Sequence, residues 1–175
     1  GVLTYEISEL KNTRDFCIDG DTIFYTRSDK TGYVVRKNGT WEHSIIRNKG
    51  GMKILKSNEG IYILFSDGLY LWNGKSLKEI YFQGNSVQGN SMKLFSNKVY
   101  IGTFDSGVLS VSHGKLKSLH SKISGLPANE VFDFYLNDNF ELIATRGGLV
   151  LIDKIKGTQK LINQFDGMAI TEIRE

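Results

Sequence analysis

The chain has 175 residues, of which 22 are Lys or Arg and 19 are Asp or Glu, so its net charge is +3. The basic residues are scattered, which argues against a nucleic-acid partner, because phosphate binding needs a concentrated basic face. No run approaches the roughly 18 apolar residues of a membrane span, and the N-terminus lacks the basic-then-apolar pattern of a signal peptide. We therefore expect either a cytosolic chain or a mature piece of a longer one.

In chain order, residues 1–10 ("GVLTYEISEL") are predicted to be the last two strands of a preceding unit. The first complete unit is predicted at residues 14–46, with short strands such as "TIFYT" and a tight turn at "KNGT". Cys17 lies between Phe16 and Ile18 and has no second cysteine as a partner. We expect it to act as a small buried hydrophobic side chain.

Three further units follow, at residues 52–80, 92–119 and 130–161. Each has an apolar strand, a polar turn, a second strand, a turn ending in glycine, a third strand, a polar turn and a fourth strand. The anchoring glycines are Gly68, Gly107 and Gly148, spaced 39 (107 minus 68) and 41 (148 minus 107) residues apart, and Gly32 precedes Gly68 by 36 (68 minus 32). A period of about forty residues is typical of the four-stranded blade of a β-propeller.

Residues 163–175 are predicted to form the first strand of a following unit. The whole chain, 1–175, is thus predicted to be one all-β domain, a β-propeller or an arc of one, with about four blades and partial strands at both ends. An arc leaves an apolar blade face uncovered at each end. We expect the ends to join in a small ring, or the chain to self-associate or to be part of a longer polypeptide.

The fourth unit, "GLPANEVFDFYLNDNFELIATRGGLVLID", resembles the two-component regulator propeller repeat. The matching positions are Gly125, Leu126, Pro127, Asn129, Thr145, Gly148 and Leu149. The match is looser in the second and third units, where Phe65 replaces the threonine and Val108 replaces the leucine. Ile143 stands where the family usually has an aromatic residue.

This resemblance implies the extracytoplasmic sensing part of a bacterial regulator, typically a hybrid histidine kinase that responds to glycans or their breakdown products. It implies a periplasmic or extracellular location and a small-molecule or oligosaccharide ligand bound without catalysis. A protein-interaction scaffold is the alternative function, and a propeller enzyme acting on carbohydrate is the third.

Motifs that would carry chemistry are weak. "NGKS" at residues 73–76 lacks the first glycine of a phosphate-binding loop, and the three histidines have no metal-ligand spacing. The carboxylates Asp67, Asp105, Asp133 and Asp138 could pair for glycoside hydrolysis, but the sequence gives no separation between them. We expect no catalytic residues, no metal and no cofactor.

Binding residues are predicted instead in the turns between second and third strands, which usual blade winding brings to one rim together with the turns between blades. Phe104 is either a stacking platform for a flat ligand or a plug between blades, and Arg146 either binds a carboxylate or pairs with a neighbouring turn. The predicted site residues are Asp29, Lys30, Ser66, Asp67, Phe104, Asp105, Ser106 and Arg146.

Overall fold

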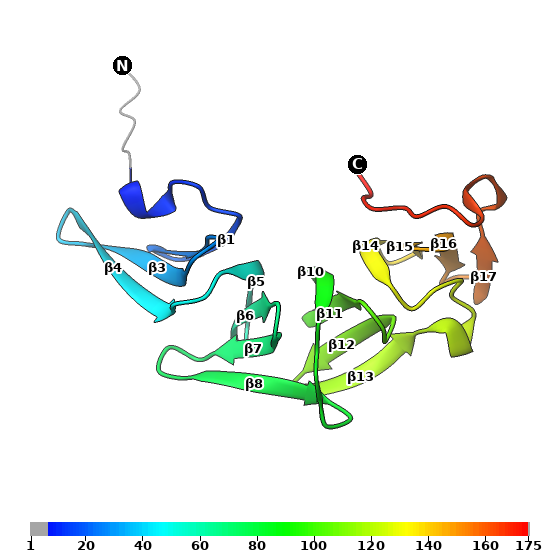
Figure 1. Cartoon of the computed structure of the whole chain (residues 1–175), viewed down its shortest axis with the longest axis horizontal. Helices are drawn as coiled ribbons and strands as arrows, with labels where there is room; N and C mark the ends of the chain where they lie inside the picture. Colours follow the sequence, from blue (N-terminus) through cyan, green and yellow to red (C-terminus); the bar gives the residue numbers. More distant parts are fainter. Residues whose placement is uncertain (1–6, 175) are drawn as a thin grey trace, which may run out of the picture.

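Four antiparallel sheets follow one another along the chain and form an open arc (Figure 1). The structure, a computed structural model, describes residues 7–174. In this part of the chain the only helices are three single-turn 3₁₀ helices, η1 (Ser8–Leu10), η2 (Lys122–Ser124) and η3 (Asn163–Phe165). The prediction of an all-β propeller arc is therefore confirmed.

Each sheet is one blade whose strands pair in chain order. Blade 1 comprises β1 (Asp15–Asp19), β2 (Thr22–Thr26), β3 (Thr31–Lys37) and β4 (Thr40–Arg47). Blade 2 comprises β5 (Gly51–Ser57), β6 (Gly60–Phe65), β7 (Gly68–Trp72), β8 (Leu77–Phe82) and β9 (Asn85–Ser86). Blade 3 comprises β10 (Gly89–Phe95), β11 (Lys98–Thr103), β12 (Val108–Ser112) and β13 (Lys115–His120). Blade 4 comprises β14 (Val131–Leu136), β15 (Phe140–Thr145), β16 (Gly148–Asp153) and β17 (Thr158–Leu161).

The first strand of each blade lies on the concave side of the arc (Figure 1). The strands are nearly continuous in hydrophobicity because neighbouring blades cover both faces of an inner sheet. In β6, for example, Ile61 and Ile63 face blade 1, whereas Tyr62 and Leu64 face blade 3. All four side chains are at most 3% exposed. Alternation along a strand thus builds two hydrophobic interfaces at once.

The second strands confirm the alignment of the units. Ile63, Ile101 and Ile143 each stand two residues before the end of their strand and belong to the cluster shared with the preceding blade. Each is at most 1% exposed. Burying such a side chain contributes about 1.5–3 kcal/mol. The repeated isoleucine therefore marks the packing of one blade on the one before it.

The expectations for the two ends need correction. Residues 1–6, most of the predicted N-terminal strands, lie outside the described residues, and Ser8–Leu10 form a 3₁₀ helix rather than a strand. Residues 163–174 contain no strand. The predicted pairing of the two ends falls partly on residues outside the described range, and the four sheets do not close into a ring.

The C-terminal segment nevertheless lies where the next blade would begin. The amide of Ile173 donates to Asp133 Oδ2 at 3.0 Å, just as the amide of Ile54, in the first strand of blade 2, donates to Asp15 Oδ2 at 2.9 Å. The amide of Ile170 donates to the carbonyl of Thr145 at 3.0 Å. The segment runs back towards the opening of the arc (Figure 1). It therefore adds a fifth wall on the concave side.

Candidate functional site

The predicted turns do lie beside the linkers that connect one blade to the next. The amide of Phe104 donates to the carbonyl of Gln88 at 3.2 Å, the amide of Gly107 to that of Asn129 at 3.0 Å, and the amide of Arg146 to that of Glu130 at 3.0 Å. Turns and linkers therefore share one rim of the arc. Among the described residues, no hydrogen bond or ion pair joins one predicted turn to another.

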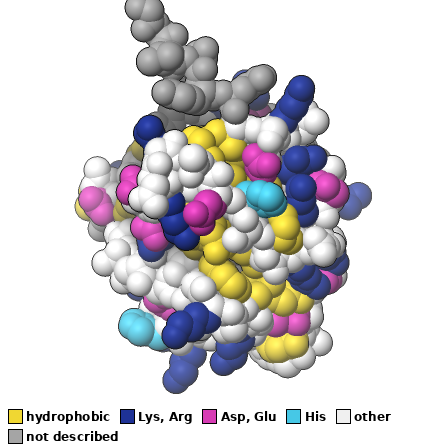
Figure 2. All heavy atoms as spheres, turned by 90° about the vertical axis from the view of Figure 1, so that its left-hand side faces the viewer, with side chains coloured by type: hydrophobic (Ala, Val, Ile, Leu, Met, Phe, Trp, Pro, Cys, Tyr) yellow, Lys and Arg dark blue, Asp and Glu magenta, His cyan; other side chains and the backbone are white. Residues whose placement is uncertain are grey.

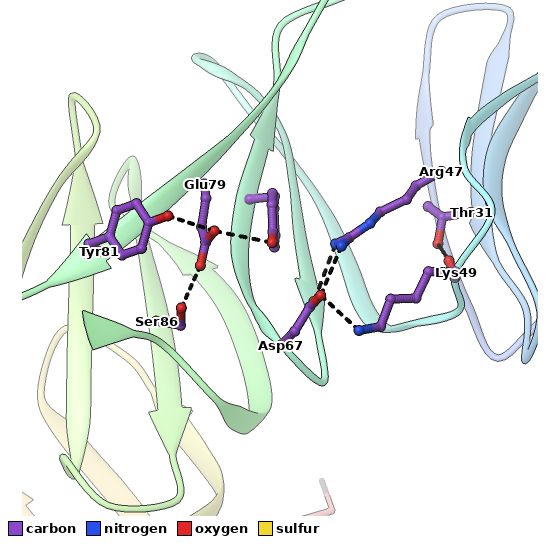
Figure 3. Close-up of polar contacts among 8 residues, drawn as sticks. Thr31, Arg47, Lys49, Asp67, Glu79, Tyr81 and Ser86 are labelled. Atoms are coloured by element: carbon purple, nitrogen blue, oxygen red, sulfur yellow. Dashed lines mark hydrogen bonds and ion pairs between the residues drawn. The ribbon is translucent and has the colours of Figure 1, made fainter. Parts of the chain in front are cut away.

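Asp67, in the turn between β6 and β7, binds two cations, Arg47 at the end of β4 and Lys49 in the linker between blades 1 and 2 (Figure 3). Arg47 donates from both terminal nitrogens, at 3.2 and 2.8 Å, and Lys49 Nζ lies 2.8 Å away. Burial opposes ionisation of Asp67, but the bonds from Lys49 and Arg47 hold its pKa below the ordinary value. This carboxylate is engaged in joining two blades.

The guanidinium of Arg47 also stacks on aromatic rings of blade 2. Its central carbon lies 4.7 Å from the ring centroid of Phe65 and 4.8 Å from that of Tyr70. Cation–π contacts and a bidentate carboxylate suit the planar guanidinium better than a lysine ammonium. Arg47 therefore has a fixed orientation at the rim.

A second polar cluster surrounds Glu79 on β8 (Figure 3). Its carboxylate accepts hydrogen bonds from Ser86 Oγ at 2.6 Å, from the Tyr81 hydroxyl at 2.8 Å and from the Tyr70 hydroxyl at 3.2 Å. The bond from Ser86 is the largest cause of a lowered Glu79 pKa. Tyr81 is 55% exposed. An exposed aromatic side chain beside fixed polar groups is suited to a sugar ring.

Asp105 and Ser106 line a small crevice between blades 2 and 3. It holds about 100 Å³, and its opposite wall is the segment from Phe82 to Val87, which includes Ser86. Ser106 Oγ donates to Asp105 Oδ1 at 2.8 Å, and the Ser106 amide donates to Thr103 Oγ1 at 2.9 Å. The crevice therefore lies next to the Glu79 cluster. We call the two together the rim site.

The other predicted residues are placed less favourably for a shared site. Asp29 is 3.3 Å from Arg27 in its own turn, and the carbonyl of Lys30 accepts the Arg27 amide. Ser66 is exposed. Arg146 pairs with Glu130 at 3.1 Å, the second of its two predicted roles, and its side chain is 74% exposed. Phe104 is 37% exposed and does not line the crevice.

Sequence reasoning missed three residues of the rim site, Glu79, Tyr81 and Ser86. It also missed Arg47 and Lys49, the partners of Asp67. No local pattern identifies them, because most of their contacts cross strands or blades. The only signal was that Arg47 and Lys49 stand in a linker between two units, beside which the next turn must pass.

The described residues offer little for metal chemistry. Residues 7–174 contain no group of three or more His, Cys, Asp and Glu side chains that could hold a metal ion. In the same range no helix is long and apolar enough to cross a bilayer.

Comparison with known proteins supports the architecture. No protein-family model and no curated protein matches the sequence. Among solved structures, the extracellular domain described as part of the hybrid two-component system BT3049 of B. thetaiotaomicron superposes with a TM-score of 0.65 at 13% identity, over 86% of this chain and 24% of that one. The corresponding domain of BT4673 gives 0.65 at 14% identity, over 95% and 24%.

A third neighbour has another role. PorZ, a surface component of the type-IX secretion system of Porphyromonas gingivalis, gives a TM-score of 0.64 at 12% identity, over 82% of this chain and 21% of that one. At such low sequence identities, the similarity to these structures shows a shared fold and nothing more. This chain spans a quarter or less of each of these three proteins. The two-component domains among them agree with the family resemblance found in the fourth unit.

Proposed function

We propose that the chain is part of the extracytoplasmic sensing module of a two-component regulator and binds a small molecule or an oligosaccharide without catalysis. The observation that carries the proposal is the agreement between the repeat motif of blade 4 and structural neighbours described as extracellular domains of two-component systems. On this proposal the location is periplasmic or extracellular, and the effector part belongs to the rest of a longer polypeptide.

The rim site is the proposed place of binding. It combines a crevice lined by Asp105 and Ser106 with the exposed ring of Tyr81 and the acceptors around Glu79. Sugar hydroxyls would donate to the carboxylates, and the apolar face of a sugar ring would lie on the tyrosine. A rigid scaffold with polar groups in its turns is a common arrangement for binding sites.

Calorimetric titration of the 175-residue chain with a panel of neutral oligosaccharides tests the binding. We expect at least one to bind, and Asp105→Asn or Tyr81→Ala to weaken it at least tenfold. Asp138→Asn, in the turn between β14 and β15 at the other end of the blade, is the matched control and should bind as the unchanged chain does. Failure of the whole panel would contradict ligand binding at the rim.

The regulator part of the proposal has its own test. The gene that encodes the chain should continue into a membrane-spanning segment and a histidine kinase or another effector. A gene that encodes neither would contradict the regulator assignment, whatever the outcome of the titrations.

A protein-interaction scaffold is the second candidate. The observation in its favour is the apolar end of the arc, where Phe16 and Ile18 on β1 are 59% and 58% exposed. Hydrophobic side chains gather on this end of the molecule (Figure 2). A partner protein that covers this end would support the scaffold function.

A further inference from the structure

The concave side of the arc contains a second polar pocket, separate from the rim site. It holds about 430 Å³ and is walled by the first strands of blades 2, 3 and 4 and by the C-terminal segment. We call it the channel pocket. Its size is within the range of about 300–1,000 Å³ that small-molecule sites occupy.

The channel pocket carries one cation without an ion-pair partner. Lys93 on β10 pairs with Asp133 at 3.1 Å, and Glu172 pairs with Arg174 at 2.8 Å. Lys53 on β5 lines the same pocket and makes no ion pair among the described residues. The pKa of Glu172 is lowered mainly by the hydrogen bond from Arg174, and Lys53 is near enough to add to this effect. An ammonium in this position can receive an anion.

Two polar groups of the pocket also lack partners. The hydroxyl of Ser91 and the side-chain nitrogen of Asn90 are buried and make no hydrogen bond within the described part of the chain. Ser91 is only 5% exposed. Buried polar groups are nearly always hydrogen-bonded, and those that are not need an explanation. Both atoms are covered by their surroundings, so a ligand in the pocket supplies an explanation if the two side chains rotate towards it.

We propose that the channel pocket binds a small hydroxylated carboxylate of the uronic-acid class. Its carboxylate pairs with Lys53, and its hydroxyls bond to Asn90 and Ser91 and donate to Asp133 and Glu172. Because Asp133 also holds the amide of Ile173, an occupied pocket ties blade 3, blade 4 and the C-terminal segment together. The inference goes beyond the proposed function, because the pocket is distinct from the rim site and binds whether or not the rim does.

Calorimetric titration of the 175-residue chain with D-glucuronate, using D-glucose as the uncharged match, tests the proposal. We expect D-glucuronate to bind at least tenfold more tightly than D-glucose, and Lys53→Met to remove most of this preference. Lys98→Met, at the exposed start of β11, is the matched control and should bind as the unchanged chain does.

Ser91→Ala gives a second readout that does not depend on charge. It should weaken D-glucuronate binding several-fold while leaving the melting temperature unchanged or higher, since the lost hydroxyl has no partner in the protein. The proposal that the channel pocket binds a uronic acid would be overturned if D-glucuronate does not bind. It would also be overturned if neither Lys53→Met nor Ser91→Ala changes D-glucuronate binding. Neutral oligosaccharide binding that depends on Asp105 would in that case still stand, so the two proposals fail separately.

Discussion

Glu141 is the most deeply buried carboxylate among the residues described. Its side chain is 9% exposed and lies 2.8 Å from His120 Nε2 and 3.0 Å from Lys154 Nζ. Burial favours the protonated acid, but the hydrogen bonds from His120 and Lys154 outweigh it and hold the Glu141 pKa below its ordinary value of 4.5. His120 ends blade 3 and Glu141 belongs to blade 4, so the charge of Glu141 contributes to the contact between these two blades.

We expect Glu141→Gln to lower the free energy of unfolding at pH 7 by about 1–2 kcal/mol, because it leaves Lys154 without its charged partner. The Glu141 pKa is lower in the folded chain, so its stabilisation is complete above pH 4.5 and is lost as the pH falls through the folded pKa. Urea unfolding at several pH values should therefore show the two curves converging in acid. Glu42→Gln, whose ion pair with Lys37 is more than half exposed, should change stability much less than Glu141→Gln, because solvent screens the pair. A constant difference between Glu141→Gln and the unchanged chain at every pH would contradict this account.

Gly148 opens β16 at φ +143°, a conformation that side chains rarely adopt. A Cβ there would lie 2.8 Å from Leu161 Cδ1 and 3.1 Å from the carbonyl oxygen of Phe165. We expect Gly148→Val to cost more than about 1 kcal/mol through backbone strain and crowding. Gly74→Val, at φ +91° with no atom within 4 Å, isolates the strain. Thermal unfolding measures both, and equal losses would show that crowding is unimportant at Gly148.

At the scale of elements, blades are joined by ionic contacts as well as by hydrophobic clusters. Arg47, the last residue of β4 in blade 1, binds Asp67 in blade 2, while Lys56 in blade 2 lies 2.7 Å from Asp19 in blade 1. These side chains are partly exposed, so solvent screening reduces what each pair contributes. The Arg47 pair is the more constrained one, because the guanidinium also stacks on two rings.

We expect a double-mutant cycle of Arg47→Met and Asp67→Asn to give a coupling energy of about 0.5–1.5 kcal/mol, measured by urea unfolding in low salt. The same cycle on Lys37 and Glu42, within blade 1, should give a value near zero. The coupling between Arg47 and Asp67 should shrink in 1 M NaCl. Equal coupling energies in the two cycles would contradict this expectation. They would mean that the pair between blades 1 and 2 is no stronger than an ordinary surface ion pair.

At the scale of the whole molecule, the arc has one end that no blade covers. Alternate residues of β1 and β4 point away from blade 2 and are exposed, with Trp41 at 37%, Ile45 at 39%, Phe16 at 59% and Ile18 at 58% (Figure 2). In the inner blades the corresponding face is buried against the preceding blade. An apolar face of this kind favours association.

We therefore expect the isolated chain to form particles heavier than its 19.7 kDa monomer, as measured by light scattering. The double substitution Phe16→Ser and Ile18→Ser should shift the chain towards monomer without lowering its melting temperature, because both side chains already face solvent. Tyr81→Ser, at a similar exposure on β8, should leave association unchanged. If light scattering finds the unsubstituted chain monomeric at high concentration, this expectation is wrong.

Much of the fold could be predicted from the sequence, and less of the candidate site. The glycine spacing predicted about four blades, and the structure has four sheets. Asp105 and Ser106 lie on a crevice at the predicted rim. The short strand β9 was missed, because two residues give no periodic pattern. The engagement of Asp67 by Arg47, 20 residues away, was also missed, because a turn carboxylate looks the same in sequence whether or not it is paired.

The sequence by itself determined the repeat and four strands in each blade, because these follow from short apolar runs and turn residues within about forty positions. Only the tertiary structure decided which polar groups meet between blades, such as the Asp133 carboxylate and the Ile173 amide, 40 positions apart. The physical reason is that hydrophobic patterning is read locally, whereas a hydrogen bond between blades depends on how far each sheet turns relative to the next. The order of the strands follows from the sequence pattern, and the partners of buried polar groups follow from the arrangement of the blades.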